Sequence, residues 1–175
     1  MTESRGAVSR KSHKDLPTLL PRLAAFARTM MGNADDARDL VQEAAARALA
    51  ARNVPTDAPA YRAWVFRIVR NAALDELRAR SPRKCELPST PLDVWRFDDA
   101  CIAKITVEQG LAAIAPAHRE IIGLIDIAGF SYAETASLLG IPVGTVMSRI
   151  ARARSALLQI IESSSLRPLK SSHGN

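Results

Sequence analysis

The chain has 175 residues, with 24 lysines and arginines against 18 aspartates and glutamates, and its formal net charge is +6 at pH 7. This length allows one domain or two small ones, and the basic excess favours a polyanionic partner. No apolar run is long enough to span a bilayer, and the basic N-terminus lacks the apolar segment of a secretory signal. We therefore expect a cytoplasmic protein that does not insert into membranes.

The charge is distributed unevenly over two neighbouring stretches. Residues 61–84 carry seven basic and two acidic residues, whereas residues 33–52 carry three basic and four acidic ones. This difference indicates that the two stretches meet different partners. The two cysteines, Cys85 and Cys101, lack the spacing of a zinc site, and a redox role for either is not favoured. We expect no metal and no other cofactor.

Two helices are predicted first, after a polar and basic tail at residues 1–14. Apolar residues recur at spacings of three and four over residues 15–31, with Asp15 as the expected N-cap and Gly32 near the end. A second helix is expected over about residues 35–52, where acidic residues in the first turns suit the helix dipole. Its expected buried face consists of Ala37, Leu40, Val41, Ala44, Ala48 and Leu49.

A third helix is predicted over about residues 60–80, after a loop with two prolines. Its expected buried face consists of Trp64, Val65, Ile68, Val69, Ala72 and Leu77. Arginines and an asparagine occupy much of the remaining surface, and Tyr61 and Trp64 lie near them in the sequence. Aromatic and arginine side chains together grip unstacked bases, although core packing is the favoured role of Trp64.

Residues 81–101 break the helical pattern and contain three prolines, which predicts a linker. Beyond it, one short helix is expected to reach residue 115, and another to run from Pro116 to about residue 128, where Gly129 ends it. The pattern as a whole predicts an all-α fold of two small helical domains joined by a flexible linker. The expected bounds are 15–81 and 104–162 for the domains, 82–103 for the linker, and 1–14 and 163–175 for the tails.

Residues 131–157 have the spacing of a helix-turn-helix. Such a motif needs a small residue between its helices, a glycine in the turn and an apolar residue that docks the second helix, and Ala136, Gly140 and Val146 fill these positions. Ser131 and Glu134 form an S-x-x-E capping box at the start of the first helix. The sequence therefore predicts a helix-turn-helix near the C-terminus.

Two stripes separate along the second helix of this motif. The stripe expected to face the core consists of Val146, Ile150, Ala153 and Leu157. The other stripe consists of Thr145, Ser148, Arg149 and Arg152. Arginine reads guanine bidentately and hydroxyl groups reach phosphates or bases, so this second stripe is typical of a helix in the major groove. The alternative is a solvated helix that only closes a small bundle.

Three motifs in order resemble the extracytoplasmic-function (ECF) group of the bacterial sigma-70 family of transcription initiation factors. Residues 36–43 (DARDLVQE) look like the region 2 helix that docks on RNA polymerase in that family. Residues 61–78 look like regions 2.3 and 2.4, which melt and read the −10 promoter element. Residues 116–120 and 129–146 look like region 4, which reads the −35 element.

The resemblance implies roles for particular residues. Those expected to contact the polymerase, at its β′ clamp helices, are Asp36, Asp39, Leu40, Gln42 and Glu43. Those expected at the −10 element are Asn53, Tyr61, Trp64, Arg67, Arg70, Asn71 and Arg78, with the loop at residues 53–59 as the pocket for a flipped base. Those expected at the −35 element are Ser131, Tyr132, Val143, Gly144, Thr145, Ser148, Arg149 and Arg152. The other partners implied are the polymerase β flap, promoter DNA and an anti-sigma factor.

Three residues depart from those usual in the family, namely Met147, Thr135 and Ile125. They lower the expected affinity for the −35 element, because fewer basic contacts to phosphate remain.

The favoured interpretation is a promoter-specificity subunit whose free form is extended about the linker. A regulator that binds DNA without polymerase would leave the basic third helix and the face at residues 35–43 unexplained. A sigma mimic that only captures an anti-sigma factor would not need DNA-reading residues such as Arg70, Arg149 and Arg152. An enzyme is least favoured, because no catalytic cluster, phosphate-binding glycine loop or metal spacing occurs in the sequence.

Overall fold

The computed structural model describes residues 15–80 and 107–165, and every regular element in these ranges is a helix. The helices are α2 (Leu16–Met31), α3 (Ala34–Ala50), α4 (Ala58–Arg80), α6 (Pro116–Ile122), the π-helix η1 (Gly123–Ile127), α7 (Tyr132–Leu139) and α8 (Val143–Ser165). Residues 107–113 are also helical. The expected all-α fold is confirmed. The expected linker, the tails at residues 1–14 and beyond residue 165, Cys85 and Cys101 lie outside the described residues.

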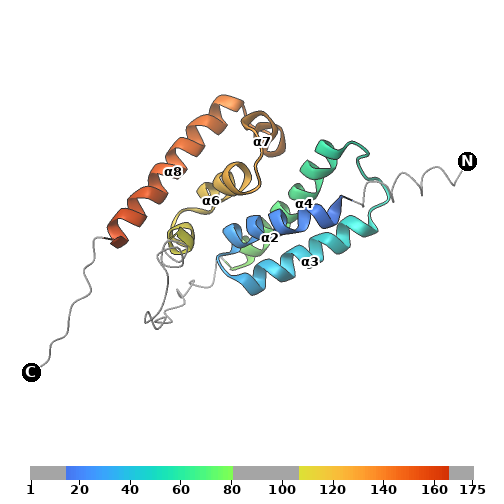
Figure 1. Cartoon of the computed structure of the whole chain (residues 1–175), viewed down its shortest axis with the longest axis horizontal. Coiled ribbons are helices and arrows are strands. Elements are labelled where there is room, and N and C mark those ends of the chain that lie inside the picture. Colours follow the sequence, from blue (N-terminus) through green and yellow to red (C-terminus); the bar gives the residue numbers. More distant parts are fainter. Residues whose placement is uncertain (1–14, 81–106, 166–175) are drawn as a thin grey trace, which may run out of the picture.

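Helices α2, α3 and α4 pack together into one bundle, the N-terminal lobe (Figure 1). Helix α3 begins after Asn33, whose side-chain oxygen accepts a hydrogen bond from the backbone N–H of Asp36 at 2.8 Å. The expected cap at Asp15 is wrong, because its backbone is already helical and its side chain accepts no helix N–H. The expected burial of Leu49 is also wrong. It is 57% exposed, since it lies a quarter turn past Ala48 and off the packed stripe of α3.

The buried side of α4 is rotated slightly from the side that the sequence predicted. Tyr61, Val65, Phe66 and Val69 are fully buried in the N-terminal lobe, whereas Trp64, Ile68 and Leu77 are only half-buried. This rotation leaves the arginines of α4 along one side of the helix, toward solvent and toward the C-terminal half of the chain.

The C-terminal lobe, residues 107–165, contains the expected helix-turn-helix. Ser131 Oγ accepts from the backbone N–H of Glu134 at 3.2 Å, and a carboxylate oxygen of Glu134 accepts from the N–H of Ser131 at 2.8 Å. Gly140 ends α7 with a φ of +67°, a conformation that suits glycine. Val146 and Ile150 are buried, as the apolar stripe of α8 predicted.

The two lobes pack directly against each other, so the expectation of an extended free chain is wrong for this conformation (Figure 1). Three rings from three segments meet at the junction. The centroid of Phe66 lies 5.6 Å from that of Phe26 and 5.0 Å from that of Phe130 in the C-terminal lobe. Leu124 and Phe130 belong to the same buried core as α2 and α4, because they cover apolar surface that the three-helix bundle leaves open.

We expect Gly123→Ala to destabilise the folded chain by about 1–3 kcal/mol, because a Cβ at this position would lie 2.8 Å from Cδ2 of Phe26. The ring of Phe26 is fully buried against Phe66 and has no room to move. Gly144→Ala is the matched control, since no atom lies within 4 Å of its would-be Cβ. Urea unfolding measures both, and equal midpoints for the two variants would contradict the close approach of η1 to α2.

We also expect Glu134→Gln to lower the free energy of unfolding by about 0.5–1 kcal/mol at neutral pH, because a charged acceptor is replaced by a neutral one. Hydrogen bonds from the Ser131 backbone and side chain hold the pKa of Glu134 below its ordinary value of 4.5. The stability from its carboxylate is therefore present above pH 4.5 and is lost as the pH falls through the lowered pKa. Thermal melts at several pH values should show the difference between wild type and variant vanish in acid; a difference independent of pH would argue against this cap.

Candidate nucleic-acid interface

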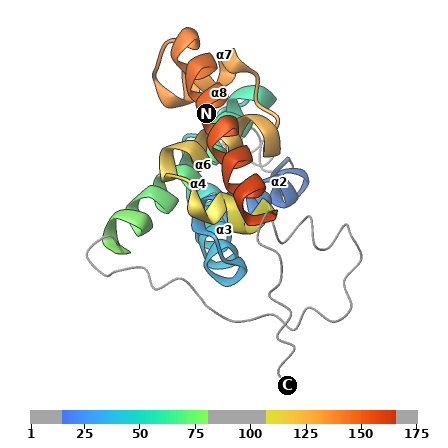
Figure 2. The ribbon, with the colours of Figure 1, turned by 90° about the vertical axis from the view of Figure 1, so that its left-hand side faces the viewer.

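One side of α8 faces away from both cores. Helix α8 lies on the side of the C-terminal lobe that is remote from the N-terminal lobe, and it is nearest to the viewer in Figure 2 (Figures 1 and 2). The exposed residues of its first three turns and the start of the fourth, apart from Val143 and Arg154, are Gly144, Met147, Ser148, Ala151, Arg152 and Ser155. A solvent-facing helix with a basic residue and hydroxyl groups, presented by a helix-turn-helix, has the form that enters a major groove.

Most residues that the sequence analysis assigned to this surface are accessible. The exposed ones are Ser131, Tyr132, Val143, Gly144, Ser148 and Arg152, whereas Thr145 and Arg149 are half-buried. The outward face also includes Met147, which is 53% exposed, and Ala151. The sequence analysis did not select these two residues, although their positions away from the Val146–Ile150 stripe would have identified them.

A second ion pair fixes how α8 sits in its lobe. Arg154 donates two hydrogen bonds to the carboxylate of Asp126 in η1, at 3.2 and 2.6 Å. A bidentate pair of this kind is directional as well as attractive. It joins α8 to the segment that packs on α2, so the recognition surface is oriented relative to the rest of the molecule.

The residues expected at the −10 element are divided between surface and core. Asn53, Arg67, Asn71 and Arg78 are exposed. Tyr61 is 1% exposed, so the expectation that it lines a pocket for a base does not hold in this conformation. It shares the buried stripe of α4, and its ring centroid lies 5.7 Å from that of half-buried Trp64.

Two arginines of α4 contact the C-terminal lobe. Arg70 Nε donates to a carboxylate oxygen of buried Glu120 in α6 at 2.5 Å. Arg62 Nη2 donates to the carbonyl oxygen of Ala128 at 2.7 Å, and its Cζ lies 3.9 Å from the centroid of the Phe130 ring. Arg70 was expected at the −10 element, and neither Arg62 nor its partners were assigned a site from the sequence, because these contacts join residues at least 50 positions apart.

The guanidinium of Arg62 is held in an unusual environment for a charged group. Burial lowers the pKa of Arg62 from its ordinary value, and Glu134, at 4.0 Å, opposes this effect. Within the described part of the chain, its buried Nε has no hydrogen-bond partner. The C-terminal lobe therefore satisfies this guanidinium only in part.

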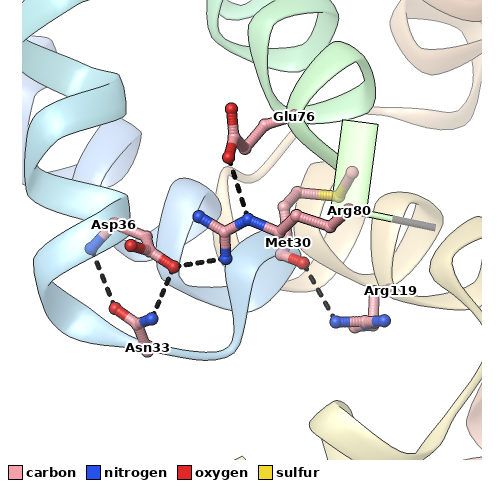
Figure 3. Close-up of polar contacts among 6 residues, drawn as sticks. All are labelled: Met30, Asn33, Asp36, Glu76, Arg80 and Arg119. Carbon is pink, nitrogen blue, oxygen red and sulfur yellow. Dashed lines mark hydrogen bonds and ion pairs between the residues drawn. The ribbon is translucent and has the colours of Figure 1, made fainter. Parts of the chain in front are cut away.

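The acidic residues of α3 fall into two groups. Asp39, Gln42 and Glu43 are exposed, as a docking surface requires. Asp36 instead closes a network inside the N-terminal lobe, where it accepts from Arg80 and from Asn33 at 2.5 Å each (Figure 3). The hydrogen bond from Arg80 holds the pKa of Asp36 below its ordinary value.

Leu40 of this helix does not belong to the surface. It is buried in the core of the N-terminal lobe, so its expected contact with a partner is not available in this conformation. The stripe that packs α3 on α2 and α4 includes Ala37, Leu40 and Ala44, and this spacing places the side chain inward.

An apolar groove of about 1030 Å³ lies where α2 and α3 meet the start of the C-terminal lobe. Gln42 of α3 lines it from one side and Leu111 from the other. Among the described residues, no three histidine, cysteine or acidic side chains are grouped so as to hold a metal ion. No helix in these ranges is long and apolar enough to cross a membrane.

Comparison with known families matches both lobes separately. The family model of sigma-70 region 2 matches residues 18–83, and that of sigma-70 region 4 matches residues 105–157. The ECF RNA polymerase sigma factor EcfG of Rhodopseudomonas palustris is 35% identical over 152 residues, which cover 84% of this chain and 83% of that protein. The ECF RNA polymerase sigma factor SigM of Mycobacterium tuberculosis is 35% identical over 145 residues, covering 80% and 71% of the two chains.

Two solved structures share this fold. The sigma factor RpoE of Bartonella quintana, in complex with the anti-sigma factor NepR, superposes with a TM-score of 0.67 at 28% identity, over 85% of this chain and 95% of that one. CnrH, in complex with the cytosolic domain of CnrY, superposes with a TM-score of 0.67 at 26% identity, over 90% and 96%. With both regions matched in order and relatives aligned over most of their length, the chain belongs to the ECF sigma factors of the sigma-70 family.

Proposed function

We propose that this sigma factor binds core RNA polymerase through α3 and directs it to promoters by reading the −35 element with α8 and the −10 element with α4. The observation that carries the proposal is the outward face of α8, which bears Ser148 and Arg152 and lies free of both cores. A DNA-binding helix needs this combination of a packed inner side and a basic, hydroxyl-rich outer side.

At the −35 element, Arg152 is the strongest base- or phosphate-contacting residue. Its Nε donates to the Ser148 carbonyl at 3.2 Å, which leaves its other donors available and holds the side chain along the helix. Ser131 and Tyr132 lie at the start of α7, where a helix N-terminus is placed to approach the phosphate backbone. Met147 adds an apolar contact in place of a basic one.

At the −10 element, the exposed basic and amide residues of α4, namely Arg67, Asn71 and Arg78, make the first contacts. Arg70 and Trp64 lie beside them on the same helix. Arginine and aromatic side chains hold an unstacked strand by stacking and by phosphate contacts.

Polymerase binding is assigned to the exposed part of α3, formed by Asp39, Gln42 and Glu43. RpoE and CnrH were each solved with an inhibitory or cytosolic partner protein, and that of RpoE is an anti-sigma factor. By this likeness an anti-sigma factor also controls this chain. The protein acts in the cytoplasm, where its polymerase is, and performs no catalysis itself.

Run-off transcription with core polymerase over a randomised promoter library tests the proposal as a whole. We expect transcripts that depend on this protein and an enriched pair of promoter elements at fixed spacing. Initiation no better than with core polymerase alone, on any template, would refute it.

Arg152→Ala should weaken binding of the holoenzyme to its selected −35 element by about 1–3 kcal/mol and, if the lost contact is to phosphate, reduce the slope of log affinity against log salt by about one. Arg154→Ala is the matched control, because it removes the same charge from the same helix at a residue already paired with Asp126. Filter binding at several salt concentrations measures both. Equal losses for the two variants would mean that only net charge matters.

Replacing Asp39 and Gln42 by alanine should weaken binding to core polymerase about ten-fold, because the charged and amide groups of α3 are lost from the interface. Asp75→Ala serves as control, since it removes an exposed acidic group of the same lobe from α4 rather than α3. The affinity is measured by fluorescence anisotropy of the labelled full-length chain titrated with core enzyme. An unchanged affinity for the double variant would place the polymerase contact elsewhere.

A further inference from the structure

The contacts that α4 makes with the C-terminal lobe have the chemistry of contacts to single-stranded nucleic acid. The Arg62 guanidinium lies flat enough over Phe130 to place its Cζ 3.9 Å from the ring centroid, and it also donates to the carbonyl oxygen of Ala128. Arg70 donates to the carboxylate of Glu120. One arginine is thus held by an aromatic ring and a carbonyl group, and the other by an anion.

Each of these groups has a counterpart in an unpaired strand. An unstacked base offers a flat π face for a guanidinium and carbonyl acceptors on its edge. A phosphate, like a carboxylate, accepts charge-assisted hydrogen bonds from arginine. We propose that Arg62 and Arg70 form a site for an unstacked base and its phosphate, and that the C-terminal lobe occupies this site with Phe130, Ala128 and Glu120 when the chain is closed. The inference rests on the proposed role of α4 at the −10 element and adds Arg62 to it.

The internal partners fill the site incompletely, as a replaceable occupant should. The side chains of Arg62 and Arg70 keep 20% and 22% of their surface exposed, so neither is sealed in a core. The Nε of Arg62 is left without a hydrogen-bond partner in the described part of the molecule. A buried unsatisfied donor is unfavourable, and a nucleic acid with further acceptors would satisfy it.

Geometry requires the occupant to leave when a promoter is bound. The −10 and −35 elements are about 25 base pairs apart by their names, or roughly 85 Å at about 3.4 Å per base pair, and DNA of this length is stiff. In the closed chain α4 and α7 are in contact. The two helices therefore cannot sit on both elements at once until the lobes separate, which frees Arg62 and Arg70.

The closed state covers the two DNA surfaces unequally. The outward face of α8 is on the far side of its lobe and stays uncovered (Figures 1 and 2). Only the strand-binding side of α4 is occupied. The closed form thus limits premature binding to single strands while leaving α8 free to meet duplex DNA.

Binding of a short fluorescein-labelled oligothymidylate to the full-length protein, followed by anisotropy at low salt, tests the proposal. Glu120→Gln keeps the shape of the occupant but removes its charge, so we expect it to bind the oligonucleotide several-fold more tightly than wild type. Asp126→Asn makes the same carboxylate-to-amide change within the same lobe, at the pair with Arg154, and should bind as wild type does. Phe130→Leu, which removes the ring but keeps an apolar side chain, should shift affinity in the same direction as Glu120→Gln.

Three outcomes are distinguishable. Tighter binding by Glu120→Gln and Phe130→Leu but not by Asp126→Asn supports the proposal. Equal affinities for Glu120→Gln, Asp126→Asn and wild type would overturn it, provided that Arg70→Ala still weakens binding. If Arg62→Ala and Arg70→Ala both bind as wild type does, α4 is not a strand-binding site, and its proposed role at the −10 element fails together with this inference.

Discussion

The packing of Phe130 between the two lobes is the contact on which the shape of the molecule depends. Its ring meets Phe66 edge-on, at an interplanar angle of 83°, and supports the guanidinium of Arg62 on another side. Large aromatic side chains contribute most of the buried apolar area at such junctions, and edge-to-face pairs add further stabilisation. Without this ring, the apolar end of the three-helix bundle and the charged side of α4 would both face solvent.

The same contact links the stability of the fold to its function. Residues that stabilise the closed chain, chiefly Arg62 and Arg70, lie on the helix proposed to bind the promoter strand. Any partner that takes these arginines must compete with Glu120 and Phe130. The affinity for a single strand is therefore reduced by the free energy of separating the lobes.

Local features of the fold were predictable because they depend on neighbouring residues. The capping box of Ser131 and Glu134, the turn at Gly140 and the buried stripe of α8 follow from spacing alone. The errors at Asp15 and Leu49 have local causes too, namely a helical backbone at the expected cap and a quarter-turn displacement from the packed stripe. The region 4 surface was largely predictable for the same reason, although Met147 was passed over in favour of half-buried Arg149.

Contacts between the lobes were not predictable in this way. Helical periodicity shows which side of a helix is buried but not what covers it, and the partners of Arg62 and Arg70 lie 66 and 50 residues away in sequence. Three prolines between the lobes favoured an extended chain, and the apolar residues at positions 124, 128 and 130 gave no sign of which lobe they would join. The burial of Tyr61 has a similar origin, because an aromatic residue near arginines suits a core and a base pocket equally well.

The distance between the lobes, free and on a promoter, is the most direct measure of the closed state and its opening. Fluorophores attached at Asp35→Cys in α3 and Leu158→Cys in α8, both exposed positions, would report it by energy transfer once Cys85 and Cys101 are replaced by serine. We expect high transfer in the free protein and low transfer in the complex with core polymerase and promoter DNA. Low transfer in the free protein, or transfer that does not change on promoter binding, would contradict the closed arrangement and its proposed opening.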